Sequence, residues 1–375
     1  MSKFSKSRLQ SAFACALVLG VVGATAQDTP PLLNHTFEEN DGGWQGIGGS
    51  GAVAVTHDAN LVKSGKGALQ YSYALKKGEF CLILLPTPDM LLSKAKSMRF
   101  WIKTDHATPI AAVMQEKDGG RYNAIFSVPK DLWQQVELSI ADFVLDRSKD
   151  APNDPDGKLD MDLVDNFGIA DMAQIFIQGD AALATVLGVS EGPRKLYMDD
   201  FTVNTPVIPP SSTLKNGEGS LDMFTRPQVG WIAIGEIAVT RVSGKPLEGF
   251  GMQAKYHQAP SKFSGVSRYV PVDSFAGAKR LALSAASLKP AKIVVQLEEK
   301  SGGKYNTIVE LPGNSGRADL TINFADFKAS DDSHDDNVKL DLDQVTQIII
   351  LDATGAIDRA DTDNTLWINN IKAIK

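Results

Sequence analysis

The clearest pattern in this chain is the alternation of apolar and polar residues over short runs separated by turn residues. Helical periodicity is nearly absent, and Asp160 and Asp341 are each expected to cap a single helical turn. Alternation with a period of two is typical of strands with one buried face. It predicts strands over 52–56, 68–74, 80–85, 98–103, 110–114, 122–128, 133–140, 167–177 and 195–203. Many short strands and few helices predict an all-β fold of the β-sandwich type.

One stretch occurs twice. Met114–Asn123 and Leu297–Asn306 share Glu, Lys, Gly-Gly, a basic residue, Tyr and Asn in the same order, and Glu299 follows Glu116 by 183 positions. The Gly-Gly pair between apolar runs predicts a hairpin turn, because glycine accepts the positive φ that such turns need. Other blocks recur in the same order: 68–73 with 251–256, 141–143 with 325–327, 158–162 with 339–343, and 196–201 with 366–371. The chain therefore contains two homologous domains.

The first residues have the order of a secretory signal peptide: three cations, an apolar run over 12–22 and then Ala24–Ala26. We expect cleavage near Ala26 and a secreted or periplasmic protein. No later segment is long and apolar enough to predict a membrane span. The predicted organisation is a signal peptide (1–26), a first domain (27–204), a Pro/Ser/Gly-rich linker (205–219) and a divergent second domain (220–375).

The net charge narrows the range of partners. It is −7 for the whole chain and −10 without the three cations of the signal peptide. An acidic chain argues against nucleic acid, which needs a basic surface, and is compatible with calcium and neutral sugars. Cys81 is the only cysteine after the signal peptide, so no internal disulfide is expected. We interpret it as a small buried residue of a strand.

Several motifs in the first domain come in a recognisable order: Phe37-Glu38 with Trp44, Ser64–Ala68 before Leu69–Tyr71, Phe100–Ile102, Trp133–Leu138 before Asp142-Phe143, and Tyr197–Asp200. They resemble the galactose-binding-like jelly-roll domains, notably family-eleven carbohydrate-binding modules and complex I intermediate-associated domains. The resemblance covers 34–203, and 250–375 more weakly. It implies two tandem jelly-roll β-sandwiches.

The resemblance also implies a structural calcium ion between the first and last strands of the domain. The residues in the matching places are Glu38, Glu39, Ser64, Asp199 and Asp200. Carboxylates from distant segments suit calcium, although such residues also serve as solvated charges on edge strands. In the second domain Asn369 and Asn370 replace the aspartates, so a second site is expected to be weaker or lost.

Sugar binding requires aromatic faces and polar side chains. The predicted ligand-binding residues, all in the first domain, are Tyr71, Tyr73, Arg99, Trp101, Lys103, Arg121, Tyr122 and Asn123. Alternation places Arg99, Trp101 and Lys103 on one face, which favours an exposed Trp101. The alternative is that these aromatic residues fill the core, as expected for Trp133. The second domain lacks several of them, so the first is the expected binder.

No catalytic motif is found. The five histidines are scattered, and no G-x-S-x-G sequence is present. The acidic loop over 153–160 fails as an EF-hand, because Pro152 and Leu163 occupy positions that need acidic residues, and we expect a solvated loop. Glu116 and Glu299 are expected to pair with neighbouring basic residues across the hairpin.

We therefore predict an exported, non-catalytic protein that binds a polysaccharide or oligosaccharide. The alternative is an envelope scaffold or assembly protein that uses the same fold for contacts with a protein partner.

Overall fold

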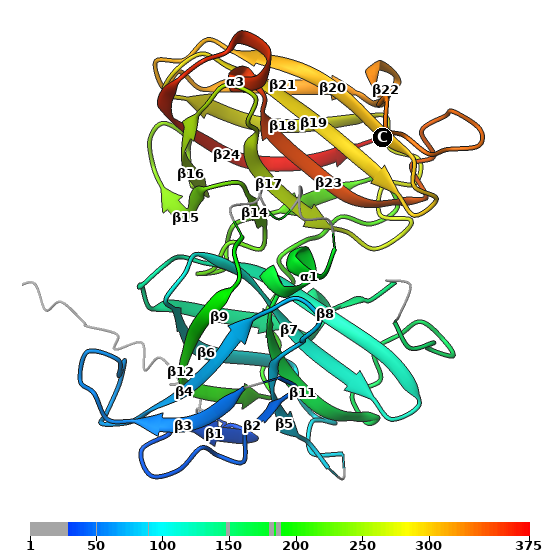
Figure 1. Cartoon of the computed structure of the whole chain (residues 1–375). Coiled ribbons are helices and arrows are strands. Elements are labelled where there is room, and N and C mark those ends of the chain that lie inside the picture. Colours follow the sequence, from blue (N-terminus) through cyan, green and yellow to red (C-terminus); the bar gives the residue numbers. More distant parts are fainter. Residues whose placement is uncertain (1–28, 50, 89, 148–150, 180–183, 185–188) are drawn as a thin grey trace, which may run out of the picture. The chain divides into compact units, whose positions relative to one another are not determined.

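The computed structural model describes residues 29–375 except 50, 89, 148–150, 180–183 and 185–188, so the predicted signal peptide lies outside the described residues. Two antiparallel β-sandwiches follow each other along the chain, each formed by two six-stranded sheets (Figure 1). The predicted all-β fold is confirmed. Within the described ranges, no helix has the length and apolar character needed to cross a bilayer.

The first domain consists of two sheets that we name after their central strands. The β6 sheet has the order β3 (Ala52–Thr56), β4 (Ala68–Leu75), β12 (Gly192–Asn204), β6 (Ser97–Thr104) and β9 (Gln134–Ser139), with β1 (Leu33–His35) beside β12. The β7 sheet has the order β10 (Val144–Leu145), β8 (Gly119–Val128), β7 (Thr108–Glu116), β11 (Val164–Asp171), β5 (Leu82–Pro86) and β2 (Gln45–Ile47). The short helices are η1 (Ile140–Asp142) and α1 (Ala173–Gln178).

The second domain repeats this arrangement. The β18 sheet has the order β15 (Ile237–Ser243), β16 (Phe250–Gln258), β24 (Thr362–Ile374), β18 (Arg280–Ser287) and β21 (Ala318–Asn323), with β13 (Gly219–Asp222) beside β24. The β19 sheet has the order β14 (Ile232–Ile234), β17 (Ser264–Tyr269), β23 (Val345–Asp352), β19 (Ala291–Glu299), β20 (Lys304–Leu311) and β22 (Lys328–Ala329). The short helices are η2 (Phe324–Asp326) and α3 (Thr354–Asp358). The strand orders of the two domains correspond one to one, so the duplication extends well beyond the repeated motifs.

Aromatic side chains fill the space between the two sheets of the first domain. The ring centroid of Phe201 lies 5.2 Å from that of Trp44 and 5.4 Å from that of Phe167. These distances are typical of favourable edge-to-face and tilted aromatic pairs. Trp231 and Phe275 are fully buried in the separate core of the second domain. Each domain thus has its own hydrophobic core.

The duplicated glutamate anchors the acidic loop instead of pairing across the hairpin. Glu116 is buried, and its carboxylate accepts a hydrogen bond from the backbone N–H of Asp160. In the second domain Glu299 accepts the equivalent bond from Asp341. The predicted cross-strand pairing of Glu116 is wrong, because its side chain is buried and bonded to the end of the loop.

A tyrosine holds the same loop at a second point. The hydroxyl of Tyr122 donates to Asp154, and that of Tyr305 donates to Asp335 in the second domain. The loops are therefore tied to their hairpins, while most residues of 153–160 are exposed, as predicted for a solvated loop. The loop approaches so closely that a Cβ atom on Gly120 would overlap the Glu116 carboxylate, which explains the second glycine of the repeat.

Two further predictions about local structure are wrong. The strand expected over 167–177 ends at Asp171, because the Asp171 carboxylate accepts a hydrogen bond of 2.9 Å from the N–H of Ala173 and turns the chain into α1. The helical turn expected after Asp160 is a simple turn closed by a bond from Leu163 N–H to the Asp160 carbonyl. Asp160 does not act as a helix cap, because residues 161–163 form only this turn before β11 begins.

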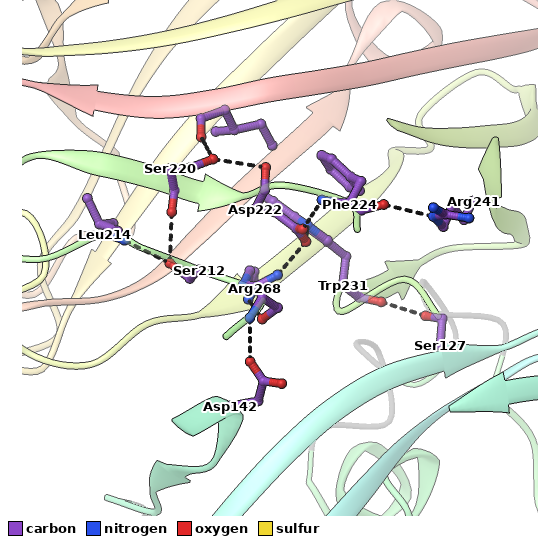
Figure 2. A network of polar contacts seen from close by, with 12 residues as sticks. Ser127, Asp142, Ser212, Leu214, Ser220, Asp222, Phe224, Trp231, Arg241 and Arg268 are labelled. Carbon is purple, nitrogen blue, oxygen red and sulfur yellow. Dashed lines mark hydrogen bonds and ion pairs between the residues drawn. The ribbon is translucent and has the colours of Figure 1, made fainter. Parts of the chain in front are cut away.

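Hydrogen bonds join the start of the second domain to the first. Ser127 in β8 donates its N–H to the carbonyl of Val229 (3.0 Å) and its hydroxyl to that of Trp231 (2.6 Å). Asp142 in η1 accepts from the N–H of Ser211 (2.6 Å) and lies 3.8 Å from Arg226. Figure 2 shows Ser127 and Asp142 beside the buried network of Asp222, Trp231 and Arg268. We call these contacts the joint.

Candidate functional site

The outward surface of the β6 sheet carries the largest group of predicted ligand-binding residues. Along β6, Phe100 and Ile102 point into the core, so Arg99, Trp101 and Lys103 point outward, as the alternation predicts. Neighbouring strands add further polar side chains to this surface. We call it the β6 face, and it consists of Gln70, Ser72, Arg99, Trp101, Lys103, Gln135, Glu137, Lys195 and Tyr197.

The register of the strands arranges these side chains in rows across the sheet. In one row, Trp101 lies between Gln135 of β9 and Asp199 of β12. In the next row, Tyr197 lies between Lys103 of β6 and Gln70 of β4. Directly opposed residues in antiparallel strands have Cβ atoms about 5 Å apart, so the side chains in each row are in reach of one another. Trp101 is thus flanked by an amide and a carboxylate, and Tyr197 by an ammonium group and an amide.

The loop over 57–66 partly covers Trp101. The ammonium group of Lys63 lies 4.2 Å from the centroid of the Trp101 ring, and Lys103 donates to the carbonyl of Asn60 (3.3 Å). Trp101 is half-buried as a result, and Lys63 is exposed. A ligand therefore reaches the Trp101 ring only beside the Lys63 side chain or by displacing it. The Lys63 side chain is flexible, with four rotatable bonds.

Tyr197 was not among the predicted ligand-binding residues. Its side chain points outward but is buried by its neighbours, and burial raises the pKa of its hydroxyl. Asp105, Asp58 and Asp131 raise this pKa further, so three acidic groups surround the tyrosine. The sequence signal for Tyr197 is its place two residues before the Asp199-Asp200 pair on an alternating strand.

Three predicted ligand-binding tyrosines lie in the core instead. Tyr71 and Tyr73 share a face, as expected, but that face points inward, and their rings stack 4.8 Å apart. The Tyr73 hydroxyl is paired with buried Asp171 at 2.7 Å. Tyr122 is buried and hydrogen-bonded to Asp154. Their positions correct the prediction that they form an exposed aromatic surface with Trp101.

The remaining predicted residues, Arg121 and Asn123, lie on the opposite side of the sandwich. Both point outward from β8 in the β7 sheet, since Tyr122 and Ala124 point into the core. Arg121 forms an ion pair with Asp146 at 2.7 Å. The structure therefore separates the predicted set into a group of three on the β6 face and a pair on the β7 sheet.

Three of the residues predicted to bind calcium, Glu38, Ser64 and Asp199, meet at the loop over 63–66. The Glu38 carboxylate accepts from the N–H of Lys66 (2.9 and 3.1 Å), and one oxygen of Asp199 accepts from the N–H groups of Lys63 (2.9 Å) and Ser64 (3.0 Å). The other Asp199 oxygen accepts from Asp200 N–H (2.8 Å). Among the described residues, no three acidic, histidine or cysteine side chains converge as metal ligands.

The Glu38 carboxylate at this loop still has acceptor positions that an ion could occupy. A carboxylate offers about four acceptor positions, and the single N–H bonded to Glu38 uses few of them. Glu38 and its exposed neighbour Glu39 carry the kind of oxygen ligands that calcium prefers. Asp199 is buried, and burial raises its pKa while the backbone N–H bonds lower it. In this structure, the Asp199 carboxylate binds backbone N–H groups of the loop over 63–66.

Outward aromatic residues that the sequence did not single out also occur in the second domain, among them Tyr269 and Trp367. Tyr269 is 48% exposed at the end of β17, in a cross-strand row with Gln347, Glu298 and Lys304. Trp367 in β24 occupies the place of Tyr197 and is half-buried. A signal for Trp367 existed in the repeat itself, whereas Tyr269 lies where the two copies diverge.

No protein-family model and no curated protein matches this chain. Among solved structures it is similar to the family 11 carbohydrate-binding module of the cellulosomal cellulase Lic26A-Cel5E of Clostridium thermocellum, at 20% identity over 42% of this chain and 94% of that one, with a TM-score of 0.35. A family 11 module from Clostridium thermocellum in complex with a β-1,3-1,4-mixed-linked tetrasaccharide is 22% identical over 42% and 95% of the two chains, with a TM-score of 0.36.

A tandem pair of domains is also similar over most of the chain. The CBM22-1–CBM22-2 tandem of Paenibacillus barcinonensis Xyn10C is 11% identical over 94% of this chain and 99% of that one, with a TM-score of 0.30. These structures include the family-eleven modules that the sequence motifs resemble. All three TM-scores are below 0.5, and no functional assignment here rests on them.

Proposed function

We propose that this is an exported, non-catalytic protein that binds carbohydrate through the β6 face of its first domain. The observation that carries the proposal is the outward, half-buried Trp101, framed in register by Gln135, Asp199 and the neighbouring row of Lys103, Tyr197 and Gln70. An indole ring offers an apolar surface to the C–H face of a pyranose, and the amide and ammonium groups offer hydrogen bonds to its hydroxyls.

Lys63 does not block this use of Trp101. A cation over an exposed aromatic ring contributes about 0.5–1 kcal/mol, whereas removing ~80 Å² of apolar surface from water contributes about 2 kcal/mol at ~25 cal/mol per Å². A sugar that stacks on Trp101 therefore displaces the exposed Lys63 side chain with a net gain. The displaced ammonium group stays next to the sugar, where it donates to a hydroxyl.

The charges of the β6 face favour a neutral glycan. Basic side chains on it or beside it are offset by acidic ones: Lys63, Arg99, Lys103 and Lys195 against Asp58, Asp105, Asp131, Glu137 and Asp199. The mature chain as a whole is acidic. A polyanionic glycan would meet no net attraction, so recognition rests on stacking and neutral hydrogen bonds.

The non-catalytic part of the proposal is supported by the tasks of the two recurrent glutamates. Hydrolysis of a glycosidic bond needs two carboxyl groups facing each other across the substrate. Glu116 and Glu299 lie in different domains, and each is buried and bonded to the backbone of its own acidic loop. Both therefore serve the fold.

The experiment is an affinity-gel and calorimetric screen of the mature protein against neutral β-glucans, other neutral plant and microbial polysaccharides, and polyuronates. Binding to a neutral glycan that is insensitive to salt supports the proposal, because contacts without net charge are weakly screened. Binding only to polyanions, with strong salt dependence, would contradict the assignment of a neutral ligand. Failure to bind any glycan would contradict the function itself.

A further inference from the structure

The second domain supplies a side chain that completes the edge of the sheet bearing the β6 face. Among the described strands, β9 pairs only with β6 and leaves its other edge open. The N–H of Glu137 in β9 donates to Oε1 of Gln228 (3.0 Å), and Nε2 of Gln228 donates to the carbonyl of Glu137 (2.7 Å). A primary amide thus pairs with both backbone groups, as the next strand of a sheet would.

Gln228 is well placed to hold β9 firmly. It is 6% exposed, so its two bonds are shielded from competing water. It lies in the same segment as Arg226, Val229 and Trp231. In the joint, these three residues contact Asp142 and Ser127 of the first domain. The segment is therefore anchored on both sides of Gln228.

The residue held by Gln228 also belongs to the β6 face. The Glu137 carboxylate forms an ion pair with Nε of Arg99 at 2.9 Å, and the two residues are direct cross-strand neighbours. Arg99 is otherwise free to sample many conformations, because its side chain is 59% exposed. Two residues away on the same face of β9, Gln135 lies opposite Trp101.

We propose that Gln228 is a positioning residue for ligand binding by the first domain, acting through Glu137 on Arg99. This inference rests on the proposed function. Under this proposal, the second domain contributes to recognition without binding a ligand itself. Its residue Gln228 holds β9, and this fixes the side of the β6 face formed by Arg99, Glu137 and Gln135. A fixed Arg99 loses less freedom when it binds a sugar hydroxyl, which tightens binding.

The test uses the full mature protein and the neutral glycan found in the screen. Gln228→Ala is expected to weaken binding about three- to tenfold, the range for freeing one long side chain. Gln228→Glu is expected to act similarly, because a second carboxylate oxygen faces the Glu137 carbonyl. Ser127→Ala is the control: it removes a hydrogen bond of the same joint without touching β9, and should leave affinity unchanged.

A double-mutant cycle separates positioning from general loosening. In an Arg99→Ala background, Gln228→Ala should have no further effect on affinity, since the group it positions is gone. Amide hydrogen exchange at Glu137 should speed up in Gln228→Ala and stay slow in Ser127→Ala.

Unchanged affinity of Gln228→Ala, an effect equal to that of Ser127→Ala, or unchanged exchange at Glu137 would each overturn the proposal. A wild-type protein that binds no glycan would instead overturn the proposed function, and this proposal with it.

Discussion

Asp199 and Asn369 occupy the same place in the two domains and form hydrogen bonds of opposite polarity. Asp199 accepts from the N–H groups of Lys63 and Ser64, whereas the amide of Asn369 donates to the carbonyls of Glu248 (2.7 Å) and Phe250 (3.3 Å). The neighbouring loop presents donors in one domain and acceptors in the other. The residue type therefore matches the loop: a carboxylate stands where the loop presents N–H donors, and an amide stands where it presents carbonyl acceptors.

Exchanging the residue types should therefore destabilise the protein. Asn369→Asp places a buried carboxylate against two carbonyl oxygens and is expected to cost about 3 kcal/mol of unfolding free energy. Asn370→Asp is the matched control, because Asn370 is exposed, and it should change stability by less than about 0.5 kcal/mol. Denaturant unfolding measures both. Equal stability of the two variants would show that the polarity of the loop does not select the residue.

The buried glutamates should make stability depend on pH. Burial, followed by the nearby carboxylates, raises the pKa of Glu116 to about 7, and the pKa of Glu299 is raised by the same causes. A group that binds its proton more tightly when folded gives stability that is lost as pH rises. The loss for Glu116 is expected between its ordinary pKa of 4.5 and about 7.

Hydrogen bonds to Asp363 and Asp361 also raise the pKa of His257. Its contribution to the stability of the protein is therefore likewise lost as the pH rises, near neutral pH. The difference between wild type and Glu116→Gln isolates the glutamate, since His257 is common to both. Thermal unfolding from pH 4 to 8 should show a smaller decline in the variant. Parallel curves for the two proteins would refute the raised pKa.

The second glycine of the repeated hairpin should be intolerant of substitution. A Cβ atom at Gly120 would overlap the Glu116 carboxylate and displace the acidic loop, so Gly120→Ala is expected to cost about 1–3 kcal/mol. Gly316→Ala is the control, because its Cβ would meet only the Gly313 carbonyl at 3.7 Å. Calorimetry distinguishes them, and a harmless Gly120→Ala would mean that the loop is not anchored as described.

Calcium remains a separate proposal. If an ion joins Glu38 and Asp200 to the loop held by Asp199, millimolar calcium should raise the melting temperature above that in chelator. Glu38→Gln should abolish this difference, and Asp363→Asn, an exposed carboxylate in the other domain, should preserve it. A melting temperature identical with calcium and with chelator would leave backbone N–H groups as the only partners of these carboxylates.

The sequence predicted the fold better than the site, for physical reasons. Alternation and the repeat are local patterns, and they gave the duplicated sandwich and the outward side of β6. Alternation alone does not say which face of β4 points inward. Tyr73 points inward, where its hydroxyl donates a hydrogen bond to Asp171, 98 positions away, and such a distant partner leaves no local pattern.

The contacts of the joint could not be predicted from the sequence either. Gln228 reaches Glu137 across 91 positions through a side chain that resembles any surface glutamine in the sequence. The anchoring of the acidic loop was hidden in the same way: its composition predicts the solvated loop that the structure shows, but not that a buried glutamate and a tyrosine from the hairpin hold it.

The central claim is that Trp101 forms the sugar-binding surface. The most direct measurement is calorimetric titration of Trp101→Ala, with Tyr269→Ala as the matched control, using the neutral glycan found in the screen. We predict about 30-fold weaker binding by Trp101→Ala, the equivalent of about 2 kcal/mol of lost apolar contact, with an unchanged melting temperature and unchanged binding by Tyr269→Ala. Full affinity in Trp101→Ala would contradict the account, and loss in Tyr269→Ala instead would move the binding surface to the second domain.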